Sequence, residues 1–485
     1  MTHGIREWYR SGEPYIWLNA GAVSLSVIMV AGLVLLIAMH GLGHFWPKSI
    51  MEFEYTEEDG TVARVLGELA DSESVARARV PAGDPRIPQD VLLVERSLIK
   101  TGNRDLLGQD FRWVLDAGMS RPSYHEDATA IERREWGNFY GYLVAVKQAG
   151  ANVAGIDDLW QAAQKEIRQT ADIFNEIRHI EKVLIGGINY KMERLRLREK
   201  GLELEGVSDP SLFNAVREER NALQGQYQEL TGRLADLYEQ LNRSSLVARV
   251  ADGQEVEIPV SKVVRAYRPN DMSMPDKLGF YFLKLWEFMS DDPREANTEG
   301  GIFPAIFGTV MMVLIMAVLV TPFGVVAAVY LREYAKQDTW TRLIRIAVNN
   351  LAGVPSVVYG VFGLGFFVYF IGGGIDEIFF REALPNPTFG TPGIMWASLT
   401  LAILTVPVVI VATEEGLSRV PREIREGSLA LGATKAETLW RTVLPMTASA
   451  MMTGLILAIA RAAGEVAPLM LVGVVKLAPS LPMDA

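Results

Sequence analysis

The chain alternates between long stretches without charged side chains and stretches that are rich in them. Four apolar stretches contain no Asp, Glu, Lys or Arg and a fifth contains two: 14–47, 302–331, 346–375, 388–413 and, with two charges, 442–475. A helix needs about 20 apolar residues to cross the hydrocarbon core of a bilayer. The pattern therefore predicts a mainly α, polytopic membrane protein with five spans. The first span is expected to be retained, because its apolar heart, 17–39, is too long for a signal-peptide core and no small-residue cleavage site follows it.

Lys and Arg gather in the loops on one side of these spans. They occur before the first span, after the second and after the fourth: Arg6, Arg10, Arg332, Lys336, Arg342, Arg345, Arg419, Arg422, Arg425, Lys435 and Arg441. The loop between the third and fourth spans has only Arg381. Because short cytoplasmic loops carry an excess of Lys and Arg, the pattern predicts a multi-pass protein of the cell inner (plasma) membrane. Its N-terminus is expected in the cytoplasm and the polar insert 48–301 outside.

The insert 48–301 has the pattern of a folded α+β domain. β-prone residues surround Asp59-Gly60 in 51–63 and alternating apolar residues surround Asp252-Gly253 in 246–260, so both segments predict β-hairpins. Between them, apolar residues follow a strict 4-3-4-3-4 spacing: Leu223, Tyr227, Leu230, Leu234, Leu237 and Leu241. An upstream partner helix is expected with these residues on its apolar face: Ile173, Ile177, Ile180 and Leu184.

That heptad spacing predicts a long antiparallel helical hairpin with a turn near 201–210. Two interpretations of this hairpin stay open. It is either a self-contained element whose seam is its own core, or an arm that docks a partner outside the membrane. The aromatic, amphipathic segment 277–289, just before the second span, predicts an elbow helix at the membrane–water interface.

Charge and cysteine usage narrow the classes of function. The 47 Lys and Arg against 58 Asp and Glu give a formal net charge of −11. This balance argues against nucleic-acid binding, which usually needs a basic surface. The absence of cysteine excludes disulfides, thiolate catalysis and cysteine-ligated metals. His40 and His44 are four residues apart without a neighbouring carboxylate, so we expect no metal site there.

The most informative loop is 414–445, which follows the fourth span on the predicted cytoplasmic side. It resembles the loop of ABC importer permeases that carries the pattern E-A-A, three residues, G, nine residues, I-x-L-P. The matching positions are Glu426, Gly427 and Ser428 for E-A-A, Gly432 for the glycine, and Leu444 and Pro445 for L-P. Thr442 replaces the isoleucine. The resemblance implies that this loop couples to a cytoplasmic ATPase.

Three further segments narrow the family: GGIFPAIFGT at 300–309, LAGVPSVVYGVFGLG at 351–365 and ARAAGEVAPLM at 460–470. With the loop, they resemble the PstA-like permease subunits of Pst-type phosphate importers, here in a long form with a large N-terminal insert. The resemblance covers about 300–485. It implies a type I ABC permease core and four kinds of partner: a second homologous permease subunit, a cytoplasmic ATPase dimer, an extracytoplasmic phosphate-binding protein and membrane lipids.

The chain is expected to have no ATPase site of its own. The stretch 427–432 has the G-x-x-x-x-G skeleton of a phosphate-binding loop, but Ala433-Thr434 follows where Lys and Ser or Thr are required. The resemblance implies that ATP and Mg²⁺ are used by the partner ATPase, and no cofactor or catalytic residue is expected in this chain.

Two charges lie inside the predicted spans, Arg461 and Glu465. Charges at membrane depth are costly and mark functional sites by default. Their spacing of four predicts one helix face. They form either a structural lock between helices or an anion-attracting substrate path, since Arg forks onto phosphate oxygens. The resemblance favours the path, because members of this family have an essential Arg and a nearby Glu at these motif positions.

We therefore predict a permease subunit of an ATP-driven phosphate importer, with three parts. These are 1–47, a short cytoplasmic N-terminus and first span; 48–301, an extracytoplasmic insert; and 302–485, a permease core. Family members have another span beyond Asp484-Ala485, so we expect a truncated sequence. The alternative is a membrane-anchored sensor or scaffold with an extracytoplasmic receptor domain, which would need a cytoplasmic output domain.

Overall fold

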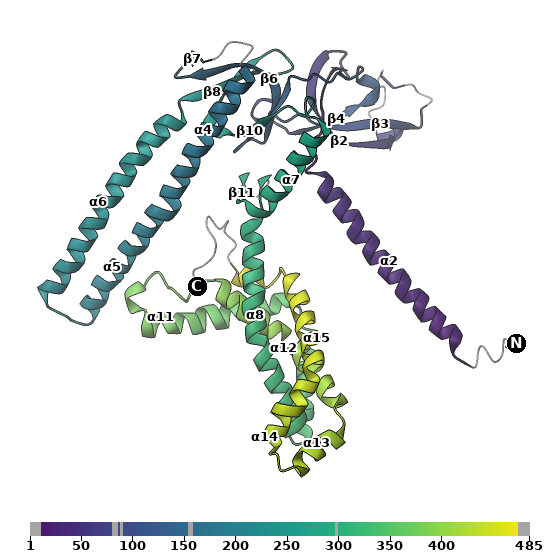
Figure 1. Cartoon of the computed structure of the whole chain (residues 1–485), viewed down its shortest axis with the longest axis vertical. Coiled ribbons are helices and arrows are strands. Elements are labelled where there is room, and N and C mark those ends of the chain that lie inside the picture. The colour runs from purple at the N-terminus through teal and green to yellow at the C-terminus, as the bar shows by residue number, and fades with distance from the viewer. Residues whose placement is uncertain (1–10, 80–85, 88–90, 154–158, 296–298, 474–485) are drawn as a thin grey trace. The chain divides into compact units, whose positions relative to one another are not determined.

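The computed structural model describes residues 11–473, with gaps at 80–85, 88–90, 154–158 and 296–298 (Figure 1). The terminal positions of earlier predictions, among them Arg6, Arg10 and Asp484-Ala485, lie outside the described residues. Two compact units make up the chain. One contains 1–176 and 236–301, and the other contains 177–235 and 302–485.

The first sheet of the insert is a four-stranded antiparallel meander. Its strands pair in chain order: β1 Ile50–Thr56, β2 Val62–Ala76, β3 Leu93–Lys100 and β4 Phe111–Leu115. The predicted hairpin around Asp59-Gly60 is confirmed, with Thr56 paired to Val62 across the turn. Alternate residues of these strands form one apolar core: Met51, Phe53, Tyr55, Val65, Ile99 and Val114. This period of two follows from the alternation of side chains along a strand.

The second sheet has the order β10-β5-β6-β8-β9, with β7 paired to β6. Its strands are β5 Ala128–Arg133, β6 Asn138–Gln148, β7 Ala151–Asn152, β8 Ser244–Arg249, β9 Glu255–Pro259 and β10 Val263–Tyr267. The predicted hairpin around Asp252-Gly253 is confirmed as β8–β9. Helix α4 (Leu159–His179) covers this sheet through Leu159, Ala163 and Ile167. Short elements complete the insert: α3 Arg104–Leu107, β11 Pro293–Arg294, β12 Glu299–Gly300 and the 3₁₀ turns at 77–79, 116–118 and 260–262.

The predicted helical hairpin is present. One arm is α4, a π-helical segment Ile180–Ile185 and α5 (Gly186–Leu204); the other is α6 (Pro210–Leu241). Most of the predicted seam is buried, whereas Tyr227 is exposed. Leu184, predicted on the apolar face, is also exposed, and Ile188 and Leu195 are buried further on. The π segment explains this shift, because its wider turn rotates the following residues out of a 3.6-residue register.

Helix α7 (Met274–Ser290) is the predicted elbow helix, and one of its faces is fixed by ion pairs. Buried Glu132 of β5 pairs with Lys284 of α7 and, at 2.6 Å, with Arg294 of β11. Burial tends to raise the pKa of Glu132, but the charges of Lys284 and Arg294 outweigh it and hold the pKa below its usual value. Trp286 is 71% exposed, as an interfacial anchor would be.

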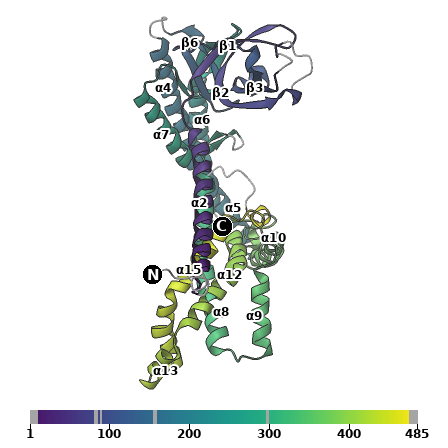
Figure 2. The ribbon, with the colours of Figure 1, turned by 90° about the vertical axis from the view of Figure 1, so that its right-hand side faces the viewer.

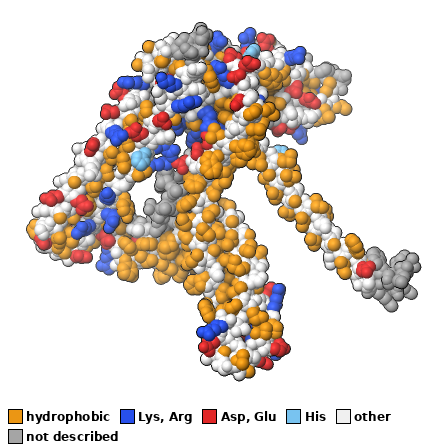
Figure 3. Space-filling view, viewed as in Figure 1, with side chains coloured by type: hydrophobic (Ala, Val, Ile, Leu, Met, Phe, Trp, Pro, Cys, Tyr) orange, Lys and Arg blue, Asp and Glu red, His pale blue; other side chains and the backbone are white. Residues whose placement is uncertain are grey.

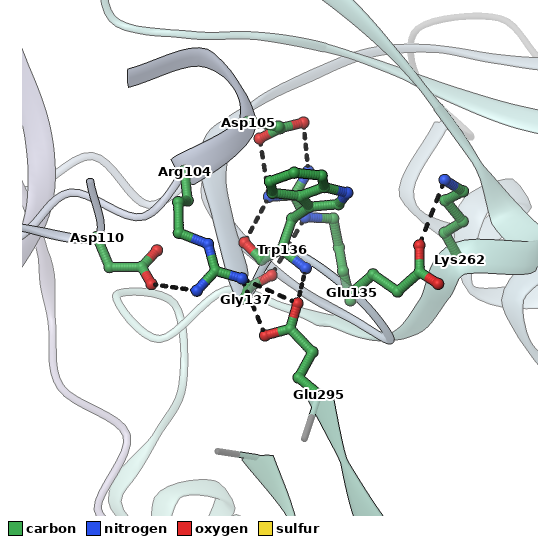
Figure 4. A network of polar contacts seen from close by, with 9 residues as sticks. Arg104, Asp105, Asp110, Glu135, Trp136, Gly137, Lys262 and Glu295 are labelled. Carbon is green, nitrogen blue, oxygen red and sulfur yellow. Dashed lines mark hydrogen bonds and ion pairs between the residues drawn. The ribbon is translucent and has the colours of Figure 1, made fainter. Parts of the chain in front are cut away.

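A second polar network ties β5 and the connection between β3 and β4 to the segment that leads into the second span (Figure 4). Arg133 forms a bidentate pair with Asp105, at 2.8 and 3.0 Å. Glu295 accepts hydrogen bonds from Arg104 and from the amide of Trp136. These contacts join β5, α3 and the exit of the insert, so the chain leaves the insert from a rigid base.

Among the described residues, five helical segments are long and apolar enough to cross a membrane: Glu13–Gly43, Phe303–Tyr334, Ser356–Phe379, Ile394–Arg419 and Lys435–Ala463. They contain α2 (Glu13–Gly43), α8 (Phe303–Val329), α10 (Ser356–Phe362) with α11 (Gly373–Phe379), α12 (Ile394–Arg419), and α14 (Lys435–Thr438) with α15 (Leu444–Ala463). The prediction of a five-span polytopic membrane fold is thus confirmed.

The third and fifth spans differ in extent from the sequence prediction. The third begins at Ser356 rather than near 346, and α9 (Thr339–Leu351) is a separate helix before it. Pro355 causes this break, because a proline excludes helical geometry from the residue before it. The fifth span ends at Ala463 rather than near 475, which changes the setting of the predicted charged pair.

Helix α12 forms the centre of the bundle of apolar helices in 302–473. It is the most buried of the five spans, and it packs on α8 and α15. Gly324 of α8 lies directly against Val409 of α12, where a β-carbon would clash, so a small residue allows the two backbones to approach. Hydrophobic side chains cover the core helices in Figure 3, and charges gather at one end of the bundle, where α13 (Arg422–Ala430) lies in Figure 2.

Candidate functional site

The fifth membrane helix is interrupted beside the predicted charged pair. Helix α15 ends at Ala463, and Gly464 caps it with a hydrogen bond from its amide to the carbonyl of Arg461, at 3.2 Å. A short helix, α16 (Leu469–Val472), begins after Pro468 and packs on α10. The prediction that both charges share one helix face is therefore wrong. Arg461 lies in the last turn of α15, and Glu465 lies just beyond it.

The two side chains still form an ion pair. Arg461 Nε lies 3.6 Å from Glu465 Oε1, with 33% and 18% of the two side chains exposed. Within the described part of the chain, Arg461 has no hydrogen bond and no second ion pair. A guanidinium carries five N–H donors, so most of its donors remain available. The negative end of the helix dipole also favours a cation at this place.

One face of the helix end that carries Arg461 is packed into the apolar core. Ala458 and Ala462 are fully buried there, in one cluster with Tyr359 of α10. The Tyr359 hydroxyl donates to the carbonyl of Leu351, at 2.6 Å. Non-helical backbone at membrane depth is tolerated where it is buried in protein or lines a cavity. Interrupted helices of this kind form substrate sites in many transporters.

The predicted coupling loop is a helix–turn–helix. Helix α13 carries Glu426, Gly427 and Ser428, and α14 follows after Gly432. Gly432 has φ +92°, a conformation that favours glycine, and open space surrounds it. The side chain of Ser428 lies 2.9 Å from that of Thr438 and closes the turn. Leu431, 91% exposed, and Trp440, 76% exposed, project from this element, as expected of a docking surface.

The predicted end of this loop at Leu444-Pro445 is wrong. The fifth span begins at Lys435 and runs through Pro445 without interruption. A π-helical segment, Leu439–Val443, precedes the proline. The proline lacks an N–H group, and the altered hydrogen bonding of a π segment accommodates that loss.

Ion pairs at the end of the bundle that carries α13 hold the predicted coupling loop in place. Arg425 of α13 pairs with Glu333 at 3.1 Å and donates to the carbonyl of Leu417 at 2.6 Å. Arg345 of α9 pairs with Glu414 of α12 at 2.6 Å. The sequence analysis used these arginines only to predict the orientation of the chain in the membrane. The sequence shows charged residues at the ends of separate spans, but it does not show which of them pair.

Part of this helical bundle is similar to a known family of protein domains. Residues 320–480 match the family described as "Binding-protein-dependent transport system inner membrane component". They contain α12, the coupling loop and the interrupted fifth helix. This part of the chain is thus similar to the inner-membrane components that the family describes.

Several curated relatives of the chain are named as phosphate transport permeases. One is the phosphate transport system permease protein PstA of Mycobacterium leprae, 34% identical over 199 residues, which are 40% of this chain and 60% of the relative. Another is PstA 1 of Mycobacterium tuberculosis (strain CDC 1551 / Oshkosh), 38% identical over 175 residues, 36% of this chain and 52% of the relative. PstA of Yersinia pestis is 36% identical over 188 residues, 39% and 57% of the two chains.

These matches confirm the predicted resemblance to PstA-type permeases, and none of them supports a sensor or scaffold. The chain spans between half and two thirds of the length of these relatives. A solved structure of the MetNI methionine ABC transporter is also similar, with a TM-score of 0.26 and 17% identity, over 40% of this chain and 74% of that one.

Proposed function

We propose that this chain is a transmembrane permease subunit of an ATP-driven phosphate importer. It forms part of the translocation path and couples that path to a cytoplasmic ATPase. The observation that carries the proposal is the match of the permease domain to relatives named as phosphate transport permeases, at 34–38% identity. The interrupted fifth helix adds a chemical reason, because among the described residues its Arg461 pairs only with Glu465 and can offer its other N–H donors to an anion.

Within this proposal, Arg461 attracts phosphate on the path and Glu465 orients the guanidinium. Glu465 also competes with the anion for Arg461, so phosphate is not held too tightly for release. The distance of 3.6 Å is consistent with a pair that opens easily. The substrate path is therefore proposed to pass the gap between α15 and α16.

The coupling loop is proposed to dock the ATPase through Glu426, Gly427, Ser428 and Gly432, together with Leu444 and Pro445 at the start of the helix α15 that follows. Movement of the ATPase would reach the core through α13 and its ion pair with Glu333. Proposed partners are a second homologous permease subunit, an ATPase dimer that uses ATP and Mg²⁺, an extracytoplasmic phosphate-binding protein and membrane lipids. The chain itself holds no proposed catalytic residue, cofactor or metal.

We also propose the orientation and the three-part division given by the sequence. The N-terminus and the coupling loop are cytoplasmic, and the insert 48–301 is extracytoplasmic. The parts are 1–47, 48–301 and 302–485.

The test is uptake of radiolabelled phosphate by the chain co-expressed with the ATPase, second permease and phosphate-binding protein of its own system, in cells that lack other phosphate importers. The proposal expects uptake that depends on ATP and on this chain. Uptake of a different solute, with no phosphate transport, would refute the assigned substrate.

A further inference from the structure

The outer half of the helical hairpin forms one compact unit with the permease core. Residues 177–235 belong to the same compact unit as 302–485, whereas the sheet-forming segments of the insert belong to the other unit. The contact is made at the tip of the hairpin. Lys200, near the end of α5, donates a hydrogen bond from Nζ to the carbonyl of Leu384, and α5 packs on the 3₁₀ turn Arg381–Ala383 (Figure 1). These residues lie in the loop between the third and fourth spans.

The hairpin tip is rigid enough to transmit force. Across its two helices, Glu199 pairs with Arg220 at 3.2 Å and with Arg217 at 4.0 Å. The same helices share an apolar core: Ile188, Leu195, Val216 and Leu223. Asp209 caps the start of α6 by accepting a hydrogen bond from the amide of Ser211, at 2.9 Å. Lys200 is thus carried by a packed, capped element and not by a loose loop.

The loop that Lys200 contacts is tied to α12. Asp376, fully buried, accepts hydrogen bonds from the amides of Phe389, at 3.0 Å, and Gly390, at 2.7 Å. Trp396 of α12 donates from its indole to the carbonyl of Phe389, at 2.7 Å. The loop therefore moves together with the start of the central helix of the core.

The opposite end of α12 contacts the coupling element. Glu414 pairs with Arg345, and the carbonyl of Leu417 accepts from Arg425 of α13. A single helix thus connects the loop under the hairpin tip with the coupling loop. Alternating access requires the core helices to change their packing, and α12 cannot shift its outer end freely while that end is held.

We propose that the hairpin tip is an intramolecular brace on the loop 381–390, and that seating and release of this brace control the transport cycle. The contact itself is independent of the transported solute. The control of transport rests on the proposed function. The sequence left two interpretations of the hairpin open, a self-contained element and an arm for a separate partner. This role differs from both, because the tip docks on a segment of its own chain.

A reversible cross-link tests the brace directly, since the chain has no native cysteine. Cysteines replace Lys200 and Glu382, and the full complex is oxidised in native membranes. The matched control replaces Lys191 and Glu382, because Lys191 is exposed on the same helix about 13 Å further from the tip. We expect a disulfide in the first pair only. Phosphate uptake should fall at least tenfold on oxidation and recover with reductant.

Two outcomes overturn the proposal: no cross-link between positions 200 and 382, or full uptake by the cross-linked complex. A complex that transports no phosphate even when reduced contradicts the proposed function and not the brace, because formation of the cross-link is measured independently of transport.

A milder variant tests the brace without the risk that two cysteine replacements cause misfolding. Lys200→Gln should speed hydrogen exchange of loop 381–390 about fivefold, the ratio for a hydrogen bond of about 1 kcal/mol, and Lys191→Gln should leave it unchanged. Unchanged exchange in Lys200→Gln would also overturn the brace.

Discussion

Arg461 and Glu465 form an ion pair across the end of a membrane helix, with Arg461 Nε 3.6 Å from Glu465 Oε1. The helix ends at Ala463, so the two charges face each other across a turn and not along a helix face. The turn is held by the amides of Gly464 and Glu465, which donate to the carbonyls of Arg461 and Ala462, each at 3.2 Å. The side-chain pair at 3.6 Å is longer than a hydrogen bond, so it can exchange partners with a passing anion while this turn stays closed.

Gly432 is expected to be essential for coupling. Replacement by Asp forces a side chain into a backbone with φ +92°, at a cost of roughly 1–2 kcal/mol, and distorts the turn between α13 and α14. Gly432→Asp should insert normally but hydrolyse ATP without matching phosphate uptake. The measurement is the ratio of uptake to hydrolysis in proteoliposomes.

Thr434→Asp serves as the matched control for that variant. Thr434 is the N-cap of α14 with φ −71°, so aspartate, itself a favoured N-cap residue, brings the same charge two residues away without backbone strain. Uptake by Thr434→Asp should stay near that of the wild type. Normal coupling by Gly432→Asp at normal abundance would remove the role assigned to this turn.

The pair of Arg425 with Glu333 should hold the coupling helix to the core. Both side chains are mostly buried, so Arg425→Gln leaves the Glu333 carboxylate poorly compensated, at a cost of about 1–3 kcal/mol. We expect hydrolysis to continue while uptake falls severalfold. Arg422→Gln, at an exposed position of the same helix, should behave as the wild type; equal effects of both changes would argue against the pair.

Glu132 should stabilise the base of the insert in a pH-dependent way. Its pKa is lowered in the folded protein, because the charges of Lys284 and Arg294 outweigh the effect of burial. The stabilisation is therefore present above the ordinary pKa of glutamate, about 4.5, and is lost as the pH falls through the lowered value. Glu132→Gln removes it at all pH values and leaves Lys284 and Arg294, which are 20% and 23% exposed, without this carboxylate, at a cost of about 1–3 kcal/mol.

Hydrogen exchange of β5 and α7 amides in the detergent-solubilised chain measures this effect. At pH 7 the variant should exchange much faster than the wild type, and the difference should shrink below pH 4.5. Glu257→Gln is a control, since that carboxylate is solvent-exposed. A difference that stays constant with pH would show that the Glu132 charge is not the cause.

The proposed orientation can be tested by cysteine labelling. Ser208, exposed at the tip of the hairpin, and Ser418, exposed at the end of α12, are suitable positions. Ser244 is unsuitable, because it is buried and its hydroxyl donates to Glu166 at 2.7 Å. In cells with an opened outer barrier, an impermeant maleimide should label Ser208→Cys and spare Ser418→Cys. The reverse pattern would invert the orientation.

Much of the fold could be predicted from local signals. The five spans follow from uncharged runs, and both hairpins follow from Asp-Gly turns between β-prone segments. The register of the upstream arm could not be predicted, because the π segment at 180–185 moves Leu184 out of the seam. The spacing of apolar residues does not reveal such a segment; it becomes evident only when the structure shows which residues beyond it are buried.

The sequence singles out Arg461 and Glu465 as a candidate site because charges are rare in membrane spans, but it does not predict their geometry. The break at Gly464 was missed, since glycine is common in such helices. The pairs of Arg425 and Arg345 join segments distant in sequence, so no spacing rule could reveal them. The contact of Lys200 with Leu384 was hidden for the same reason.

Phosphate uptake by the double variant Arg461→Leu, Glu465→Met tests the central claim most directly. Apolar residues of similar volume preserve a purely structural pair, and such replacements are often neutral or stabilising. The account predicts that the variant assembles with its partners but loses uptake, and that Arg461→Lys is also poor because a point charge does not reproduce the fork. Wild-type uptake by the assembled double variant would contradict the account.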